Sequence, residues 1–258
     1  YLYYLNGSFS PTAWRSYFVW AFIIKTPVPF LVILFAAFVY FRKQNLNFLN
    51  NLFILLPSAL FLFMASWKAH NIGIRYILPI YPFLILYVGG FIEIFRYFDI
   101  STFRYFKTKI KIAPILILVL TGWYVFSTVS TYPNHLAYFN ELIGGSKNGY
   151  KYLDDSNIEW GQDLKRLAVY QKENPDLKVM YSWSAFIDAK RFYGIKNIVP
   201  LQLSERWWDD PSGKYAVNTH ALIRFKLASQ KYGEEKLNWP ELYEPIDKIG
   251  QSFFIYEF

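Results

Sequence analysis

The sequence predicts a membrane-embedded all-α bundle of about four transmembrane helices, followed by a small α/β domain with a mainly parallel sheet. The first observation is the distribution of charge: 17 of the 19 acidic residues follow Thr131, and only Glu93 and Asp99 precede it. The second is that four long apolar runs make up much of the first half, whereas the second half is typical of a water-soluble domain. We therefore expect two domains, residues 1–131 in the membrane and residues 132–258 in water.

Each apolar run is a candidate transmembrane helix, because about 20 apolar residues are needed to cross roughly 30 Å of hydrocarbon. The four predicted spans lie near residues 26–41, 49–67, 77–95 and 112–131. The first run is short. We expect the aromatic stretch 17–24 before it to lie along the membrane interface, with a break at Lys25.

Basic residues outside the runs predict which side of the membrane each loop faces. An Arg-Lys pair at 42–43 follows the first run, and five more basic residues lie within 96–111. These two loops are expected to be cytoplasmic, because positive charge is enriched on that side. Residues 1–25, the segment 68–75 and everything after Thr131 should then be extracytoplasmic. The prediction is a multi-pass protein of the cell membrane with an extracytoplasmic C-terminal domain.

In the second half, short segments rich in strand-forming residues alternate with helical patterns. The predicted strands are 177–183, 197–201, 214–219 and 252–258, and the predicted helices include 185–193 and 221–231. A further amphipathic helix follows Asp163, and Ser156 and Glu159 have the S-x-x-E spacing of a capping box before it. Strands that alternate with helices favour a mainly parallel sheet.

Several kinds of chemistry have no motif in this sequence. There is no cysteine, and the three histidines, His70, His135 and His220, are scattered, so we expect no metal site. There is no glycine-rich phosphate loop, and we expect no cofactor. Residues 132–258 carry 16 basic and 17 acidic side chains, a net charge of −1. Such a domain is not expected to bind nucleic acid.

The loop between the second and third runs is the first candidate site. Lys68, His70, Arg75 and Tyr76 lie within one short turn at the expected outer membrane surface, and Lys25 is expected on the same side. Because arginine and lysine bind phosphate oxygens well, these five residues are candidate ligands for a phosphate or pyrophosphate head group. The alternative is that the basic side chains only anchor helix ends at the interface.

The acidic segment 154–163 is the second candidate site. Its candidate acceptor-binding residues are Asp155, Asn157, Glu159, Trp160, Gln162 and Asp163. Carboxylates, amides and a tryptophan face suit the hydroxyl groups and the apolar face of a sugar, and paired carboxylates can also transfer protons. The alternative is a helix N-terminus, where acidic residues stabilise unpaired N–H groups.

Five short sequence strings together resemble those of one known family. They are YPNHLAYFNEL at 132–142, DSN at 155–157, WGQDL at 160–164, KTP at 25–27 and NIGIRY at 71–76. In these strings the chain resembles the C-terminal part of prokaryotic multi-pass membrane glycosyltransferases of the GT-C type. These enzymes are similar to the dolichyl-phosphate-mannose protein mannosyltransferases. The resemblance covers most of the chain.

The resemblance implies transfer of a sugar, of a mannosyl or other hexosyl type, at the outer face of the membrane. The implied partners are membrane lipid, a polyprenyl-phosphate sugar donor and a protein, lipid or glycan acceptor. In such enzymes the catalytic acidic residue lies in the first outward loop of the whole protein. The chain begins at Tyr1 and is expected to start after that loop, so no catalytic residue is assigned. The alternative is a non-catalytic, membrane-anchored module that binds a glycan or a protein.

Overall fold

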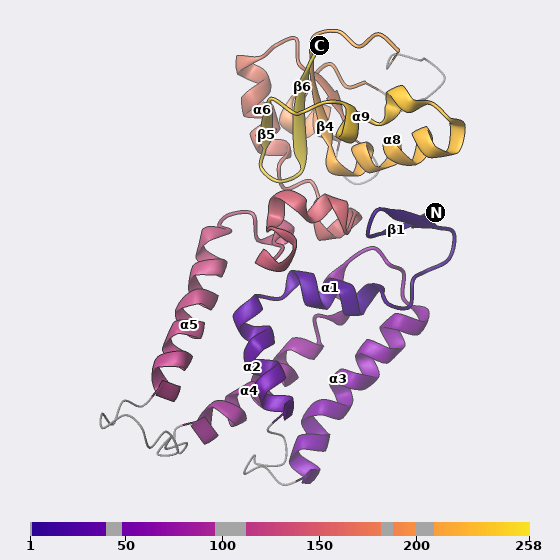
Figure 1. Ribbon diagram of the computed structural model, residues 1–258. Helices are drawn as coiled ribbons and strands as arrows, with labels where there is room; N and C mark the ends of the chain where they lie inside the picture. The colour runs from indigo at the N-terminus through magenta and orange to yellow at the C-terminus, as the bar shows by residue number, and fades with distance from the viewer. Residues whose placement is uncertain (1, 40–47, 96–111, 182–187, 200–208) are drawn as a thin grey trace. The chain divides into compact units, whose positions relative to one another are not determined.

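The computed structural model describes residues 2–39, 48–95, 112–181, 188–199 and 209–258, with only the backbone described at 92–95 and 112–114. The chain forms two compact units (Figure 1). The helical unit comprises residues 12–135 and 139–145, and the α/β unit comprises Tyr1–Pro11, Leu136–Tyr138 and Ser146–Phe258. Three segments thus lie across the boundary expected at Thr131: the N-terminal residues join the α/β unit, and 132–135 and 139–145 join the helical unit.

Five α-helices make up most of the helical unit among the described residues. They are α1 (Tyr17–Lys25), α2 (Val28–Val39), α3 (Phe48–Lys68), α4 (Ile80–Phe95) and α5 (Ile112–Ser130). The 3₁₀ helices η2 (Ile74–Ile77) and η4 (Glu141–Ile143) complete it, and η3 (His135–Ala137) follows α5. Helix α4 packs against both α2 and α3, and α2 also contacts α5.

The prediction of four transmembrane helices is wrong. Among the described residues, only α3 is long and apolar enough to cross a membrane by itself. Helices α1 and α2 meet the same requirement only when taken together, and they are bent by 115° at the break between them. The structure therefore offers one membrane-spanning helix, or two if the bent pair forms a single span.

Prolines interrupt two of the predicted runs. Pro27 falls between α1 and α2, and the described part of α2 has 12 residues, about 18 Å of rise. Pro79 immediately precedes α4, so the run predicted at 77–95 is divided between η2 and a helix whose described part has 16 residues, about 24 Å. The end of the first predicted span, at 40–41, and the basic loops at 42–43 and 96–111 lie outside the described residues.

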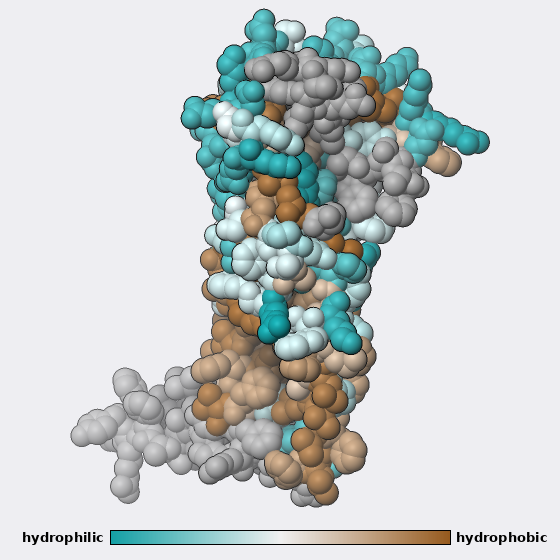
Figure 2. Space-filling model, turned by 90° about the vertical axis from the view of Figure 1, so that its right-hand side faces the viewer, coloured by the Kyte–Doolittle hydropathy of each residue, from teal (hydrophilic) through white to brown (hydrophobic). Residues whose placement is uncertain are grey.

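Exposure of apolar side chains supports membrane association for α3, although one or two apolar helices are weak evidence by themselves. Only 17% of its apolar window is buried within the protein. Phe53, Phe63 and Met64 are each more than half exposed, whereas the core helix of a soluble protein would bury such side chains. Hydrophobic residues gather on the surface of the helical unit in Figure 2, and hydrophilic residues dominate that of the α/β unit.

The α/β unit contains helices and strands in mixed order. Its strands are β1 (Tyr3–Leu5), β2 (Ser8–Ser10), β3 (Lys178–Met180), β4 (Lys214–Asn218), β5 (Asp247–Ile249) and β6 (Phe253–Glu257). Its α-helices are α6 (Leu164–Glu173), α7 (Ala189–Tyr193), α8 (Thr219–Tyr232) and α9 (Trp239–Leu242). The 3₁₀ helices are η5 (Ser146–Lys151), η6 (Asp155–Asn157) and η8 (Glu235–Leu237).

The main sheet is mixed, and the prediction of a mainly parallel sheet is also wrong. Its strand order is β3-β4-β6-β5. Among the described strands of this sheet, β3 and β4 pair in parallel, whereas β6 is antiparallel to both β4 and β5. Three residues, 250–252, connect β5 to β6. A parallel crossover needs a dozen residues or more, so this short connection can only form a hairpin.

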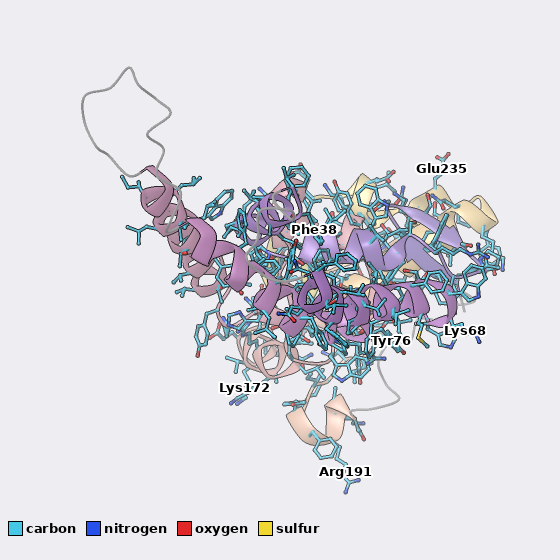
Figure 3. The ribbon with its side chains drawn as sticks, turned by 90° about the horizontal axis from the view of Figure 1, so that it is seen from below. Phe38, Lys68, Tyr76, Lys172, Arg191 and Glu235 are labelled. Atoms are coloured by element: carbon cyan, nitrogen blue, oxygen red, sulfur yellow. The ribbon has the colours of Figure 1, made fainter. Side chains whose placement is uncertain are left out.

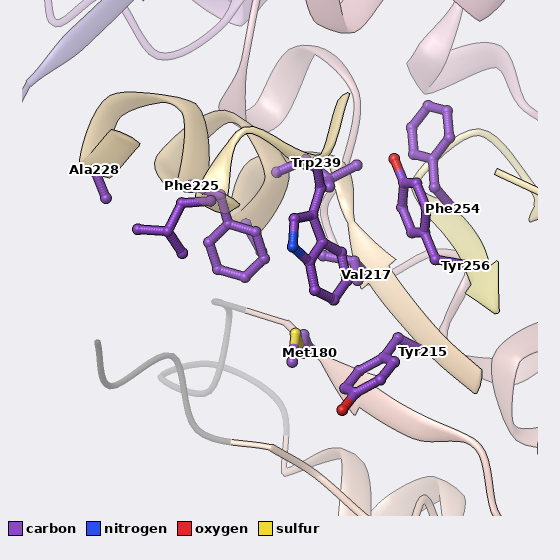
Figure 4. Packing of buried hydrophobic residues seen from close by; sticks show 11 residues of the cluster. Met180, Tyr215, Val217, Phe225, Ala228, Trp239, Phe254 and Tyr256 are labelled. Atoms are coloured by element: carbon purple, nitrogen blue, oxygen red, sulfur yellow. The ribbon is translucent and has the colours of Figure 1, made fainter. Parts of the chain in front are cut away.

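Helices cover both faces of the sheet and create two cores. On one face, side chains of α8 and α9 pack around Trp239 with Tyr215, Val217 and Tyr256 of the central strands (Figure 4). On the other face, the hydrophobic side chains of α6 pack with alternate residues of the same strands, among them Ala216. Strands β4 and β6 are therefore buried on both faces, which explains their nearly continuous apolar sequence.

A β-hairpin from the start of the chain joins the α/β unit. Asn6 and Gly7 between β1 and β2 have φ values of +50° and +80°, as in the type I′ turns that close two-residue hairpins. The N–H of Asn6 donates to the carbonyl of Tyr152 at 2.9 Å, and the Tyr4 hydroxyl donates to the carbonyl of Lys151 at 3.0 Å. These bonds attach the hairpin to η5 and the residue after it.

Candidate functional site

The predicted phosphate-binding loop follows the C-terminus of α3. Lys68 is the last residue of that helix and is exposed, and Arg75 and Tyr76 lie in η2 (Figure 3 labels Lys68 and Tyr76). The Arg75 guanidinium carbon lies 5.3 Å from the centre of the Tyr76 ring. Tyr76 in turn makes an edge-to-face contact with Phe18 of α1, with ring centres 6.1 Å apart. His70 is exposed in the same loop.

The structure adds Arg15 to this group. Its guanidinium carbon lies 4.2 Å from the centre of the Trp67 ring, next to Lys68 in sequence. The backbone N–H of Trp14 donates to the side-chain oxygen of buried Asn71. This bond joins the segment before α1 to the loop after α3. Sequence reasoning missed Arg15, because no spacing rule connects residues more than fifty positions apart. We call Arg15, Lys68 and Arg75 the cationic rim.

Lys25 lies elsewhere on the helical unit. It ends α1, and its Nζ is 4.3 Å from the centre of the Phe139 ring. Phe18, which contacts Tyr76, is seven residues earlier, about 10 Å along the helix axis. Lys25 therefore does not join the residues around Tyr76 in a single cluster, although the sequence placed them in one candidate site.

Asn140 explains why α1 ends beside Lys25. Its backbone N–H donates to the carbonyl of Ile24 at 2.9 Å, and its side-chain Nδ2 donates to those of Ile23 at 2.6 Å and Thr26 at 2.7 Å. Pro27 has no N–H with which to continue the helix, so the last carbonyls need other partners. One fully buried asparagine supplies three such hydrogen bonds.

Most of the predicted acceptor-binding residues are buried inside the α/β unit. Asp155, Asn157, Glu159 and Asp163 are each less than one-tenth exposed. Helix α6 begins at Leu164 with Asp163 at its N-cap position, so Ser156 and Glu159 do not form the predicted capping box. These carboxylates face the protein interior and do not form an open surface for a sugar.

Trp160 and Gln162 are the exposed members of the set. Trp160 is 46% exposed. The amide of Gln162 closes the turn around it: Nε2 donates to the carbonyl of Ile158 at 2.8 Å, and Oε1 accepts from the N–H of Trp160 at 2.7 Å. Gln162 thus fixes the backbone that presents the indole.

Asp163 holds three parts of the unit together. Its carboxylate accepts from the Ser252 hydroxyl at 2.6 Å, the backbone N–H of Gln251 at 3.1 Å and the guanidinium of Arg166 at 3.0 Å. Gly250 lies against the same carboxylate, and a Cβ at that position would be only 2.1–2.2 Å from its atoms. The site is therefore full, and its role is to tie the turn between β5 and β6 to α6.

Glu159 is the most perturbed carboxyl group of this region. Burial, and then the negative charge of Asp163, raise its pKa to about 8. The Asn218 amide is near enough to lower this pKa in part. However, neither Oε2 of Glu159 nor Nδ2 of Asn218 has a hydrogen bond within the described structure. A proton on Glu159 at neutral pH reduces the cost of placing this carboxyl beside Asp163.

His220 and Arg224 bind the buried Asp154 carboxylate in a polar cluster that the sequence did not indicate. Nδ1 of His220 and one guanidinium nitrogen of Arg224 lie 2.9 Å and 3.0 Å from the Asp154 carboxylate. Burial raises the pKa of Asp154, but His220 and Arg224 outweigh this effect and hold the pKa below its usual value. Arg224 also donates to Nε2 of His220 at 3.3 Å. Because Arg224 occupies that nitrogen, the imidazole is not placed to act as a base.

Described residues of the α/β unit line at least two cavities. One, of about 390 Å³, is lined by residues that include Gln171, Lys172 and Tyr193. A second, of about 330 Å³, is lined by residues of the N-terminal hairpin, η5, α8 and α9. Among the described residues there is no group of three or more His, Asp or Glu side chains that could hold a metal ion.

Comparisons with known proteins leave the family of this chain open. No protein-family model matches the sequence, and neither a curated protein nor a solved structure matches it.

Proposed function

We propose that this chain is the C-terminal portion of an integral membrane glycosyltransferase. It would transfer a sugar from a polyprenyl-phosphate carrier to a protein, lipid or glycan acceptor, with the donor phosphate held by the cationic rim. The proposal places the protein in the cell membrane as a multi-pass protein, with the α/β unit on the extracytoplasmic side. It also expects the general base to come from a part of the protein outside this chain.

The observation that carries the proposal is the placement of Arg15, Lys68 and Arg75 on segments that helix α1 connects. All three are exposed, and they come from the segment before α1, the end of α3 and η2. Helix α1 contacts both α3 and η2, which brings these segments together. The Arg15 guanidinium lies over the Trp67 ring, a placement in which its in-plane N–H groups point away from the ring toward phosphate oxygens. The C-terminus of α3 carries partial negative charge, so the side chains and not the helix must attract the phosphate.

This geometry suits the chemistry of glycosyl transfer. When the bond between the sugar C1 and the phosphate oxygen breaks, the electron pair stays on the leaving phosphate and its negative charge grows. Cationic groups placed beside that oxygen stabilise the charge in the transition state. An acceptor hydroxyl forms the new bond to C1 and gives up its proton. The rim would therefore contribute to catalysis as well as to binding.

The experiment compares Arg15→Ala and Arg75→Ala with the unaltered protein. Binding of the protein to vesicles that contain a polyprenyl phosphate, and sugar transfer by the full-length protein, are both measured. Loss of one charged phosphate contact should weaken binding about tenfold, and Arg75→Lys should weaken it less. Arg191→Ala is the matched control, because Arg191 is an exposed arginine of the α/β unit that extends outward (Figure 3). Equal binding by all variants would refute the phosphate assignment.

A non-catalytic membrane-anchored module that binds a glycan or a protein is the second candidate. The observation that favours it is the burial of Glu159 and Asp163, which leaves the predicted acidic pair of the α/β unit out of reach of a substrate. Sugar transfer by the full-length protein, lost in Arg75→Ala, would exclude the module. Vesicle binding without any transfer from a range of polyprenyl-phosphate sugars would favour it.

A further inference from the structure

The cavity of about 330 Å³ has the size of a small-ligand site. Four separate segments of the α/β unit line it: the N-terminal hairpin, η5, α8 and α9. The hairpin that forms one wall is attached by two hydrogen bonds to η5 and the residue after it, so this wall belongs to the folded unit.

Part of the cavity wall is apolar. Leu222 and Ile223 of α8 are buried side chains that line it, and Tyr150 adds an aromatic ring. That ring packs edge-to-face on Phe254 of the sheet, with ring centres 5.1 Å apart. Its position is therefore set by the core and does not depend on a ligand. A flat apolar group could rest against this wall without first ordering it.

The polar groups of the cavity include both hydrogen-bond donors and acceptors. Nζ of Lys226 lies 2.6 Å from one carboxylate oxygen of Glu241, and the Asn238 amide donates to the other at 2.8 Å. Each carboxylate oxygen has a further lone pair, and the ammonium group has further N–H bonds. The Tyr150 hydroxyl makes no hydrogen bond to any residue that the structure describes, and the exposed Lys151 follows it.

We propose that this cavity binds one pyranose ring of a neutral glycan. A pyranose has an apolar C–H face for the wall and hydroxyl groups at its edge, which donate and accept in equal measure. The Lys226 ammonium is already paired with the Glu241 carboxylate, so a phosphate would bind this lysine only by displacing that carboxylate. A purely apolar ligand would displace the water that hydrogen-bonds to the Tyr150 hydroxyl and to the Lys226–Glu241 ion pair, and it would offer no hydrogen bonds in return. The identification of this ring as part of the acceptor rests on the proposed transferase function. The binding of a pyranose in the cavity does not depend on that function.

The test titrates the full chain, in detergent micelles, with the methyl glycosides of mannose, glucose and galactose. Binding is followed by calorimetry and by ligand-observed NMR. We expect saturable binding of at least one glycoside. Tyr150→Phe removes only the hydroxyl and should weaken that binding about fivefold, the effect of one neutral hydrogen bond. Glu241→Gln, a change at an exposed position, should weaken it as well.

Tyr193→Phe is the matched control, because it makes the same chemical change in the other cavity. It should leave binding unchanged, and thermal unfolding should show that all variants are folded. If no glycoside binds, or if Tyr150→Phe and Tyr193→Phe weaken binding equally, the inference is wrong. The outcome is separate from that of the transferase proposal: glycoside binding here, without sugar transfer by the full-length protein, would keep the sugar site and refute the transferase.

Discussion

Nδ1 of His220 lies 2.9 Å from the Asp154 carboxylate, although 66 positions separate the two residues in the sequence. Asp154 precedes η6, and His220 lies in the first turn of α8. Arg224, one turn later in α8, binds the same carboxylate and also donates to the carbonyl of Leu2 at 3.1 Å. This cluster therefore joins the N-terminal hairpin, the acidic segment and the longest helix of the α/β unit.

Asp154→Asn should destabilise the α/β unit by about 3 kcal/mol at neutral pH, because it removes the buried negative charge that the partly buried Arg224 and His220 bind. The pKa of Asp154 is lowered in the folded state, so its contribution is present above the ordinary value of 3.8 and is lost as the pH falls through the folded value. The difference between the variant and the unaltered protein should therefore shrink in acid. Urea unfolding at several pH values measures this, with exposed Asp176→Asn as the control.

Glu159→Gln should have the opposite pH dependence. The folded pKa of about 8 lies above the ordinary value of 4.5, so the unaltered protein loses stability as the pH rises between these values. Because glutamine cannot ionise, the stability of the variant does not fall over this pH range. The variant should gain stability relative to the unaltered protein by up to about 4 kcal/mol between about pH 5 and pH 8. A stability difference that stays constant with pH would show that Glu159 is not buried in this way.

Gly250→Ala should destabilise the α/β unit by more than 2 kcal/mol, because the new Cβ would overlap the Asp163 carboxylate at a residue with φ of +60°. Gly213→Ala separates the two effects. Gly213 has φ of +78° but nothing within 4 Å of an added Cβ, so it should cost only about 1 kcal/mol. Thermal unfolding of the two variants gives the comparison. Equal losses would mean that the turn can move away from Asp163.

Asn140→Ala should loosen the junction between α1 and α2. Its loss leaves the carbonyls of Ile23 and Thr26 without their amide donor, at a cost of about 2 kcal/mol or more. Limited proteolysis near residues 23–27 and thermal unfolding in detergent would detect the change. Leu142→Ala, an exposed neighbour in η4, is the control and should behave like the unaltered protein. Unchanged protease resistance in Asn140→Ala would contradict the capping role.

Local sequence patterns located several elements of the α/β unit. Strand β4 was predicted at 214–219 and is observed at Lys214–Asn218, and helix α8 was predicted at 221–231 and is observed at Thr219–Tyr232. Asn218 caps α8 by accepting from the N–H of Ala221 at 2.8 Å, and Gly233 ends it in the left-handed conformation. These signals lie within a few residues of the element that they define, so they can be read without the fold.

The pairing of strands could not be read in the same way. Strand β5 was not predicted at all, and the predicted strand at 197–201 contributes only the bridge between Val179 and Ile198 among the described residues. Residue order does not state which strands become neighbours. Strand β6 follows β5 in sequence yet also pairs with β4, because its two apolar faces are both buried in that central position.

The candidate sites show the same limit. The segment 154–163 has the composition of a sugar-binding surface, but the fold turns Glu159 and Asp163 inward and leaves Trp160 exposed. Arg15 was not suspected, because its contact with Trp67 joins residues more than fifty positions apart in the sequence. The Asn6-Gly7 pair was the one overlooked local signal, since this dipeptide favours a hairpin turn.

The sequence alone determined the division into an apolar and a polar half, the absence of cysteine chemistry and the position of the elements with strong local signals. These properties depend on composition and on neighbours a few residues apart. Only the tertiary structure decided how many helices are long enough to cross a membrane, how the strands pair, which carboxylates are buried and which aromatic rings the cations contact. Those outcomes depend on contacts between distant residues, whose free energies no local pattern contains.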